Sequence, residues 1–247
     1  MDGPSHDDGT RRPHHDVEAG LRLEKSRKIV MMLGRRLDLL GADLLEVGTG
    51  SGYMAGAFAD AVGPEGRVRS VDANDVREST AGYEFTKVDG TTLPFDDAAF
   101  DAAVSNHVLE HVGTVDDQAH HLAEIRRVLR PGGVAYVAVP NRWRVIEPHL
   151  HLPLLSWLPS ALADRYVRAT RKGEWYDVVP PSGATMRRLL DGSGLDWEDA
   201  TIEAMRLMAE VETAGPVARR LLTAPERALR AVPVLPSLIY VAHRPAA

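Results

Sequence analysis

The sequence of 247 residues contains no cysteine, which excludes disulfide bonds and thiolate metal sites. No run of about 18 apolar residues occurs, so we expect no membrane-spanning helix. Basic residues are not in excess: 29 Lys and Arg stand against 35 Asp and Glu, and the net charge of −6 argues against a general nucleic-acid-binding protein. The polar N-terminus lacks the apolar segment of a signal peptide, and we therefore expect a cytoplasmic protein.

The remaining composition, 44% hydrophobic and 26% charged, is that of an ordinary globular protein. The length suits one α/β domain with an insertion. Residues 1–16 are polar and rich in His, Asp, Gly and Pro, and we expect a disordered tail there. We assign residues 17–247 to a single domain, whose first helix we expect to end at Gly41.

Residues 44–52 form the central motif of the sequence, a predicted strand that ends in a glycine-rich turn. An apolar strand runs into a turn with glycine at every second position, and a helix of small residues follows. Such a unit binds anions or nucleotides, because glycines let a ligand approach the backbone and the first N–H groups of the helix face it. The spacing is E-x-G-x-G-x-G from Glu46, whereas a dinucleotide turn needs G-x-G-x-x-G and has a third glycine where Tyr53 stands.

A second predicted strand, residues 68–72, ends in a carboxylate, Asp72, which lies 20 residues beyond Gly52. In a doubly wound sheet, an acid at this strand end reaches the ribose hydroxyls of a nucleoside bound on the first turn. Capping of the following segment by Asp72 is the alternative. The next predicted strand, residues 84–89, follows so closely that the helix between the two strands must be short or missing.

Further motifs follow in order up to residue 141: the run Asp89-Gly90-x-x-Leu93-Pro94-Phe95, a buried strand at 101–105, and Leu-Arg-Pro-Gly-Gly at 129–133 before an apolar strand at 134–139. Together with the glycine turn, they resemble the class I S-adenosylmethionine-dependent methyltransferases of type 11, a group that includes quinone, glycan and natural-product methyltransferases. The resemblance implies an α/β fold. It would be a doubly wound, Rossmann-like and mostly parallel seven-stranded sheet with helices on both faces, and its last strand would lie antiparallel beside the fifth.

The same resemblance implies S-adenosylmethionine as the cofactor and a set of residues that bind it. The glycine turn should line the methionine and ribose side, through Glu46, Gly48, Gly50 and Gly52. Asp72 should bind the ribose, and Asp89 with Gly90 the adenine. Asn106 or His107 should close the methionine end.

Residues 142–181 break the alternation of strands and helices. They hold three of the four tryptophans, and six basic residues stand against four acidic ones. An insertion after the fifth strand lies over the carboxyl edge of the sheet, where substrate must enter, and we interpret it as a substrate lid. A helical decoration with its own apolar core is the alternative. The apolar run 150–158 also leaves peripheral membrane contact open.

Methyl transfer from a sulfonium is an in-line displacement that depends mainly on positioning, and a hydroxyl nucleophile also needs a general base. His107 and His149 lie at the expected carboxyl edge, and histidine is the residue type suited to proton transfer near neutral pH, so we predict them as catalytic residues. A structural hydrogen-bonding role is the alternative for each. We predict a small-molecule acceptor, with an aromatic or glycosidic hydroxyl, and no metal; the oligomeric state stays open.

Three other functions compete with this interpretation. The run from His107 to His111 matches H-x-x-E-H, the inverted zinc-protease signature, although Gly113 would end any helix there almost at once. A dinucleotide-dependent oxidoreductase would share the sheet and the acid at the end of the second strand. A methyltransferase-like domain without turnover, which only binds its cofactor or a partner, would share every motif.

Overall fold

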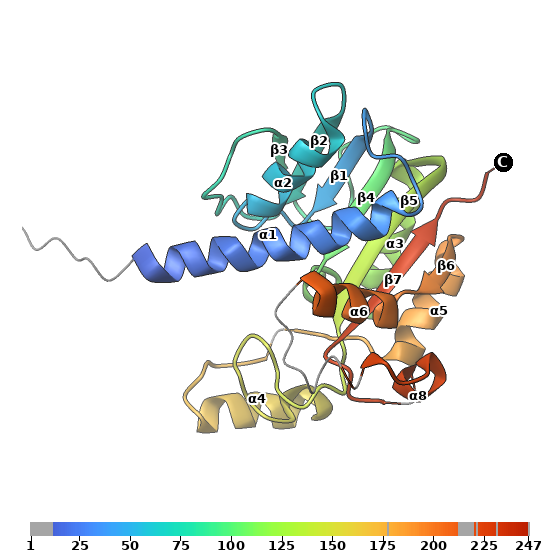
Figure 1. Ribbon diagram of the computed structural model, residues 1–247. Coiled ribbons are helices and arrows are strands. Elements are labelled where there is room, and N and C mark those ends of the chain that lie inside the picture. The colour runs from blue at the N-terminus through green and yellow to red at the C-terminus, as the bar shows by residue number, and fades with distance from the viewer. Residues whose placement is uncertain (1–11, 177, 212–219, 221, 231, 247) are drawn as a thin grey trace, which may run out of the picture.

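The computed structural model describes residues 12–176, 178–211, 220, 222–230 and 232–246. Its centre is a 7-stranded sheet in the order β3-β2-β1-β4-β5-β7-β6 (Figure 1). The strands are β1 Asp43–Val47, β2 Arg67–Asp72, β3 Glu84–Lys87, β4 Phe100–Asn106, β5 Leu129–Pro140, β6 Asp196–Asp199 and β7 Ser237–His243. The first five run parallel, while β7 is antiparallel to both β5 and β6. The predicted doubly wound α/β fold is confirmed, including the antiparallel last strand beside the fifth.

Helices cover both faces of the sheet. One face packs against α1 (Arg12–Gly34), α2 (Tyr53–Val62) and α6 (Thr201–Val211), and the other against α3 (Val115–Val128) and α5 (Gly183–Ser193). Figure 1 shows α1 in blue, lying across the first of these faces. Central strands buried on both sides are short and apolar, which is why they read as continuous hydrophobic runs.

Two helix starts follow from their capping residues. Thr114 and Asp117 form a capping box at α3, in which each side chain bonds the backbone N–H of the other residue. At α5 the hydroxyl of Ser182 accepts a hydrogen bond from the N–H of Thr185 and caps the helix. No helix occurs in residues 73–83, so the missing helix between the second and third strands is confirmed as well.

Three predicted boundaries differ from the structure. The helix α1 ends at Gly34, and Gly41 instead belongs to the turn before β1, where its N–H bonds the carbonyl of Val62. The same helix begins at Arg12, inside the predicted tail, of which residues 1–11 lie outside the described part of the chain. Residues 130–133 do not separate helix from strand. They are part of β5, where the register against β4 shifts between Phe100 and Ala102.

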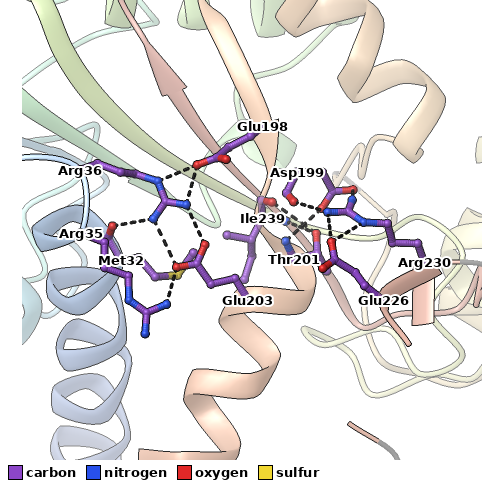
Figure 2. Close-up of polar contacts among 10 residues, drawn as sticks. All are labelled: Met32, Arg35, Arg36, Glu198, Asp199, Thr201, Glu203, Glu226, Arg230 and Ile239. Carbon is purple, nitrogen blue, oxygen red and sulfur yellow. Dashed lines mark hydrogen bonds and ion pairs between the residues drawn. The ribbon is translucent and has the colours of Figure 1, made fainter. Parts of the chain in front are cut away.

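Ion pairs tie α1 to the far edge of the sheet (Figure 2). Arg36 donates to the carbonyl of Met32 and bonds the carboxylates of Glu198 on β6 and Glu203 on α6. Beside this group, Arg230 of the short helix α8 (Glu226–Arg230) pairs with Asp199 and Glu226. These pairs connect segments that are far apart in the sequence.

The insertion at 142–181 has a small apolar core of its own. Leu152, Leu155, Ala163 and Val167 form it, around the turn η2 (Leu155–Trp157) and the helix α4 (Ser160–Ala169). In Figure 1, α4 lies apart from the helices that flank the sheet. Among the described residues, no helix combines the length and the hydropathy needed to cross a bilayer.

Candidate functional site

A cleft of about 650 Å³ opens at the carboxyl ends of β1, β2 and β4. It gathers seven of the residues that the sequence predicted for the site: Gly48, Gly50, Asp72, Gly90, Asn106, His107 and His149. Three others, Glu46, Gly52 and Asp89, do not line it. A second cavity, of about 430 Å³, lies between β7 and α5 and contains none of the motifs.

The glycine turn has a left-handed backbone that leaves the cleft open. Gly50, at φ 51°, faces the cleft, and a Cβ there would meet no atom within 4 Å. Gly52, at φ 81°, is the N-cap of α2, and a Cβ there would collide with the carbonyl of Ser79 and the hydroxyl of Tyr83. No side-chain hydrogen bond caps the N-terminus of α2 at Gly52.

Asp72 lies at the end of β2, on the wall of the cleft. Its Oδ2 accepts a hydrogen bond of 2.9 Å from the N–H of Gly50, and its Oδ1 accepts one of 3.0 Å from the N–H of Asn74. A carboxylate has about four acceptor sites, so further lone pairs remain for ligand hydroxyls.

Glu46 lies beneath the turn, 2% exposed, and not in the cleft. The hydroxyl of Ser70 donates to Glu46 Oε2 at 2.8 Å, so in the 2.5 Å contact between Thr49 and Ser70 the hydroxyl of Thr49 is the donor. Burial is the main reason that the pKa of Glu46 rises to about 8. Glu46 is thus connected to the turn through Ser70 and Thr49.

Of the two residues predicted to bind adenine, Asp89 and Gly90, only Gly90 lines the cleft. Gly90, at φ 81°, lines the cleft, while the side chain of Asp89 is exposed. Beside them, Thr91 also lines the cleft, and its hydroxyl bonds Nδ1 of His120 at 2.7 Å.

His107 follows β4 directly and has a positive φ of 59°. Its N–H donates to the carbonyl of Ala138 at 2.8 Å, and its Nδ1 lies 3.4 Å from Oε1 of Glu110. Left-handed backbone is uncommon outside glycine, and it occurs often at sites where geometry is fixed for function.

His149 reaches the cleft from the insertion, paired with a buried carboxylate. Nδ1 of His149 lies 2.6 Å from Oε1 of Glu147, which is fully buried and accepts two more hydrogen bonds, from the N–H groups of His149 and Leu150. This carboxylate raises the pKa of His149. Burial opposes ionisation of Glu147, but the hydrogen bonds together hold its pKa below the ordinary value.

The lining residues that were missed in the sequence include two with chargeable side chains, His121 and Arg22. His121 of α3 is buried and bonds the hydroxyl of Ser105 at 3.0 Å, and burial lowers its pKa to about 4. Its position four residues before the buried Ile125, on the same helix face, was a signal that could have found it. Arg22 of α1 also lines the cleft, and no motif in the sequence points to it.

Comparisons with known proteins agree with this geometry. A family model described as a methyltransferase domain matches residues 45–137. A probable S-adenosylmethionine-dependent methyltransferase of Mycolicibacterium smegmatis is 38% identical over 182 residues, which cover 70% of this chain and 65% of the relative. An uncharacterized methyltransferase of Mycobacterium sp. (strain JLS) is 32% identical over 166 residues, covering 65% of this chain and 62% of the relative. The chain thus spans less than two thirds of the length of these relatives.

A solved structure shares the fold. The S-adenosylmethionine-dependent methyltransferase of Mesorhizobium loti superposes with a TM-score of 0.56 at 17% identity, covering 84% of this chain and 93% of that one. At this level of identity the likeness concerns the arrangement of strands and helices alone.

Proposed function

Because the chain belongs to the class I S-adenosylmethionine-dependent methyltransferases, we propose that it transfers the methyl group of S-adenosylmethionine to a hydroxyl of a small aromatic or glycosidic molecule. The observation that carries this proposal is a single cleft. It combines the glycine turn, the carboxylate of Asp72 and a carboxylate-bound histidine from the insertion, His149.

The residues of the cleft fit the cofactor, since a Cβ at Gly50 would occupy the space that the turn leaves open. In the proposed complex Asp72 accepts hydrogen bonds from the ribose hydroxyls, as Gly48 and Gly50 bring their backbone close to the ligand. Gly90 binds the adenine edge and Asn106 closes the methionine end, whereas the exposed side chain of Asp89 lies outside the cleft. Glu46 and Gly52 act on the turn itself, one from beneath and one at its end.

Bound S-adenosylmethionine supplies a methyl group on a positively charged sulfur. The main contribution of the protein is to hold an acceptor oxygen in line with that methyl and sulfur, since orientation alone is worth several kcal/mol. Residues from the strand ends and from the insertion lie on the wall of the same cleft, an arrangement that suits this task.

The pair Glu147–His149 supplies the proposed base. With Nδ1–H donating to Glu147, the Nε2 of His149 keeps its lone pair and accepts the proton of the acceptor hydroxyl. His107 is the second proposed catalytic residue, because it lines the same cleft and its left-handed backbone holds it at the end of β4.

The insertion is proposed as the acceptor-binding part. Trp143 and Trp157 pack edge to face with ring centroids 5.6 Å apart, and both stay partly exposed, at 40% and 36%. Partly exposed rings suit an aromatic or sugar acceptor. The same exposed rings suit a lipid-linked acceptor at a membrane surface, which is the second candidate for the acceptor class.

Calorimetric titration with S-adenosylmethionine and, separately, with NADH tests the cofactor. We expect micromolar binding of the first alone; binding of NADH alone would overturn the proposal in favour of an oxidoreductase. A panel of phenols and glycosides, assayed for release of S-adenosylhomocysteine, then tests the transfer. His149→Gln should lose turnover with unchanged cofactor affinity, and the exposed His151→Gln is the matched control. Cofactor binding without turnover on any acceptor would favour a non-catalytic binding protein.

A further inference from the structure

Glu110 is a buried carboxylate without a hydrogen-bond partner. Its exposed fraction is 0%, and neither carboxylate oxygen accepts a hydrogen bond from any residue that the structure describes. The nearest charged or chargeable groups are Nδ1 of His107 at 3.4 Å and Nε2 of His111 at 4.0 Å. A buried charge without compensation is costly, so this carboxylate needs a cation or a proton close by.

Ligand atoms for a cation are already gathered around it. Glu110, His111 and His149 each offer one ligand atom, and these three atoms lie within 4.8 Å of one another. Ligands around a tetrahedral ion with bonds of about 2.1 Å lie about 3.4 Å apart. Both imidazoles are exposed, and their rings meet edge to face with centroids 4.9 Å apart, so binding of an ion would draw the three ligand atoms closer together.

Glu147 orients one of these ligands. Its carboxylate holds Nδ1 of His149 at 2.6 Å, so Nε2 is the nitrogen with a free lone pair. Histidines that bind metals ordinarily donate their other ring N–H to a carboxylate or a carbonyl in this way. The backbone also ties the insertion, which carries His149, to the segment that carries Glu110 and His111. The N–H of Val179, at the far end of the insertion, donates a hydrogen bond to the carbonyl of Glu110.

We propose that Glu110, His111 and His149 bind a divalent transition metal ion such as Zn²⁺ at the acceptor end of the cleft. Two imidazoles and one carboxylate suit such an ion, and three protein ligands leave a coordination position open. The cluster differs from the inverted zinc-protease signature. The turn η1 (Leu109–His111) is only 3 residues long, and the second histidine ligand is His149, from the insertion, in place of His107.

The role of the ion rests on the proposed methyl transfer. At the open position the ion binds an oxygen of the acceptor and lowers the pKa of its hydroxyl. With the ion bound, Nε2 of His149 would be a ligand and would no longer serve as the base. His107, the second proposed catalytic residue, would accept the hydroxyl proton while the oxygen bonds the methyl carbon and the carbon–sulfur electron pair returns to sulfur. The acceptor class is thereby narrowed to molecules whose reacting oxygen also binds a divalent metal ion.

Metal titration of chelator-treated protein tests the site independently of turnover. All proteins carry His6→Gln, His14→Gln and His15→Gln, so that the histidine-rich N-terminus contributes no binding. We expect Zn²⁺ to bind one to one in calorimetry and Co²⁺ to give the visible absorption of a tetrahedral site. His111→Gln, His149→Gln and Glu110→Gln should each weaken Zn²⁺ binding by tenfold or more, and Glu147→Gln by about 10- to 100-fold. The exposed His151→Gln and His120→Gln are controls.

No Zn²⁺ binding by the parent, or full binding after His111→Gln and after His149→Gln, would overturn the proposed metal site. His111 and His149 are exposed, so loss of fold does not confuse these two variants. Titration of the same metal-free protein with S-adenosylmethionine separates the two proposals. Cofactor binding without Zn²⁺ binding would overturn only the metal site, and Zn²⁺ binding without cofactor binding only the proposed function.

Discussion

The backbone N–H of Gly50 donates a 2.9 Å hydrogen bond to Oδ2 of Asp72, which ties the middle of the glycine turn to the end of β2. The carboxylate of Asp72 therefore contributes both to the glycine turn and to the end of β2, the two parts of the proposed cofactor site. It holds the left-handed turn in place before any ligand binds and keeps further lone pairs for the ligand. Preorganisation of this kind lowers the entropy that binding must offset.

Asp72→Ala removes both contributions. We expect the affinity for S-adenosylmethionine to fall by about 1–3 kcal/mol, roughly 5- to 150-fold, because the ribose hydroxyls lose their acceptor. Calorimetric titration measures the change. Asp75→Ala is the matched control, since Asp75 is close in sequence but its carboxylate pairs with Arg77 outside the cleft. Equal affinities of Asp72→Ala and the wild type would refute the ribose assignment.

Alanine at Gly50 and at Gly52 should have different effects. Both residues have positive φ, which costs an L-residue about 1–2 kcal/mol. At Gly50 the added methyl meets no atom and enters the cleft, so we expect a folded protein with at least about tenfold weaker cofactor binding, or about 1.4 kcal/mol. At Gly52 the methyl collides with the carbonyl of Ser79, and we expect a much larger loss of stability.

Thermal melting and calorimetry of the two glycine variants check this difference. A melting temperature of Gly50→Ala far below that of Gly52→Ala would show that the space around Gly50 is not open as the structure has it. Wild-type cofactor affinity in a folded Gly50→Ala protein would instead remove the turn from the binding site.

The sequence predicts the fold well because its signals are local. The alternation of strand and helix and the turn glycines each depend on neighbouring residues, and both agree with the structure. The end of α1 was misplaced because Gly41 carries the expected positive φ in a later turn. The glycine therefore predicts the positive φ correctly but not the element to which Gly41 belongs.

The polar side of the cleft could be predicted only in part. The positions of His107 at a strand end and of His149 in the insertion predict that both lie at the cleft. No periodicity or motif in the sequence predicts the hydrogen bond between His149 and Glu147. The sequence predicts Glu110 only as part of the H-x-x-E-H signature. Its burial depends on how the insertion packs against η1, which the sequence does not indicate. The contact between Glu110 and the insertion joins distant segments, and Glu147 and His149, although 2 residues apart, meet only through the irregular backbone of the insertion, so no sequence pattern predicts either contact.

Two neighbouring arginines in the turn that follows α1, Arg35 and Arg36, should differ in their contribution to stability (Figure 2). The side chain of Arg36 is 15% exposed and bonds Met32, Glu198 and Glu203, whereas that of Arg35 is 51% exposed and bonds Glu203 alone. We expect Arg36→Ala to lower the free energy of unfolding by about 1.5–3 kcal/mol and Arg35→Ala by about 0–1 kcal/mol. Urea unfolding measures both, and equal losses would contradict the view that α1 is fastened through Arg36.

His121 should make the fold sensitive to mild acid. In the unfolded chain its pKa is about 6.5, and burial lowers the folded value to about 4. Between these values the unfolded state binds a proton that the folded state does not, so stability is full above pH 6.5 and falls as the pH drops toward 4. The interval corresponds to about 3 kcal/mol, at about 1.36 kcal/mol per pH unit.

Urea unfolding at neutral pH and near pH 4.5 measures this loss. His121→Gln keeps a group that can bond the hydroxyl of Ser105 but does not titrate, so it should lose about 2–3 kcal/mol less than the wild type on acidification. His151→Gln is the control, because that imidazole is exposed on the insertion and should leave the acid response unchanged. Identical acid responses of His121→Gln and the wild type would mean that His121 is protonated, or exposed to water, in the folded protein.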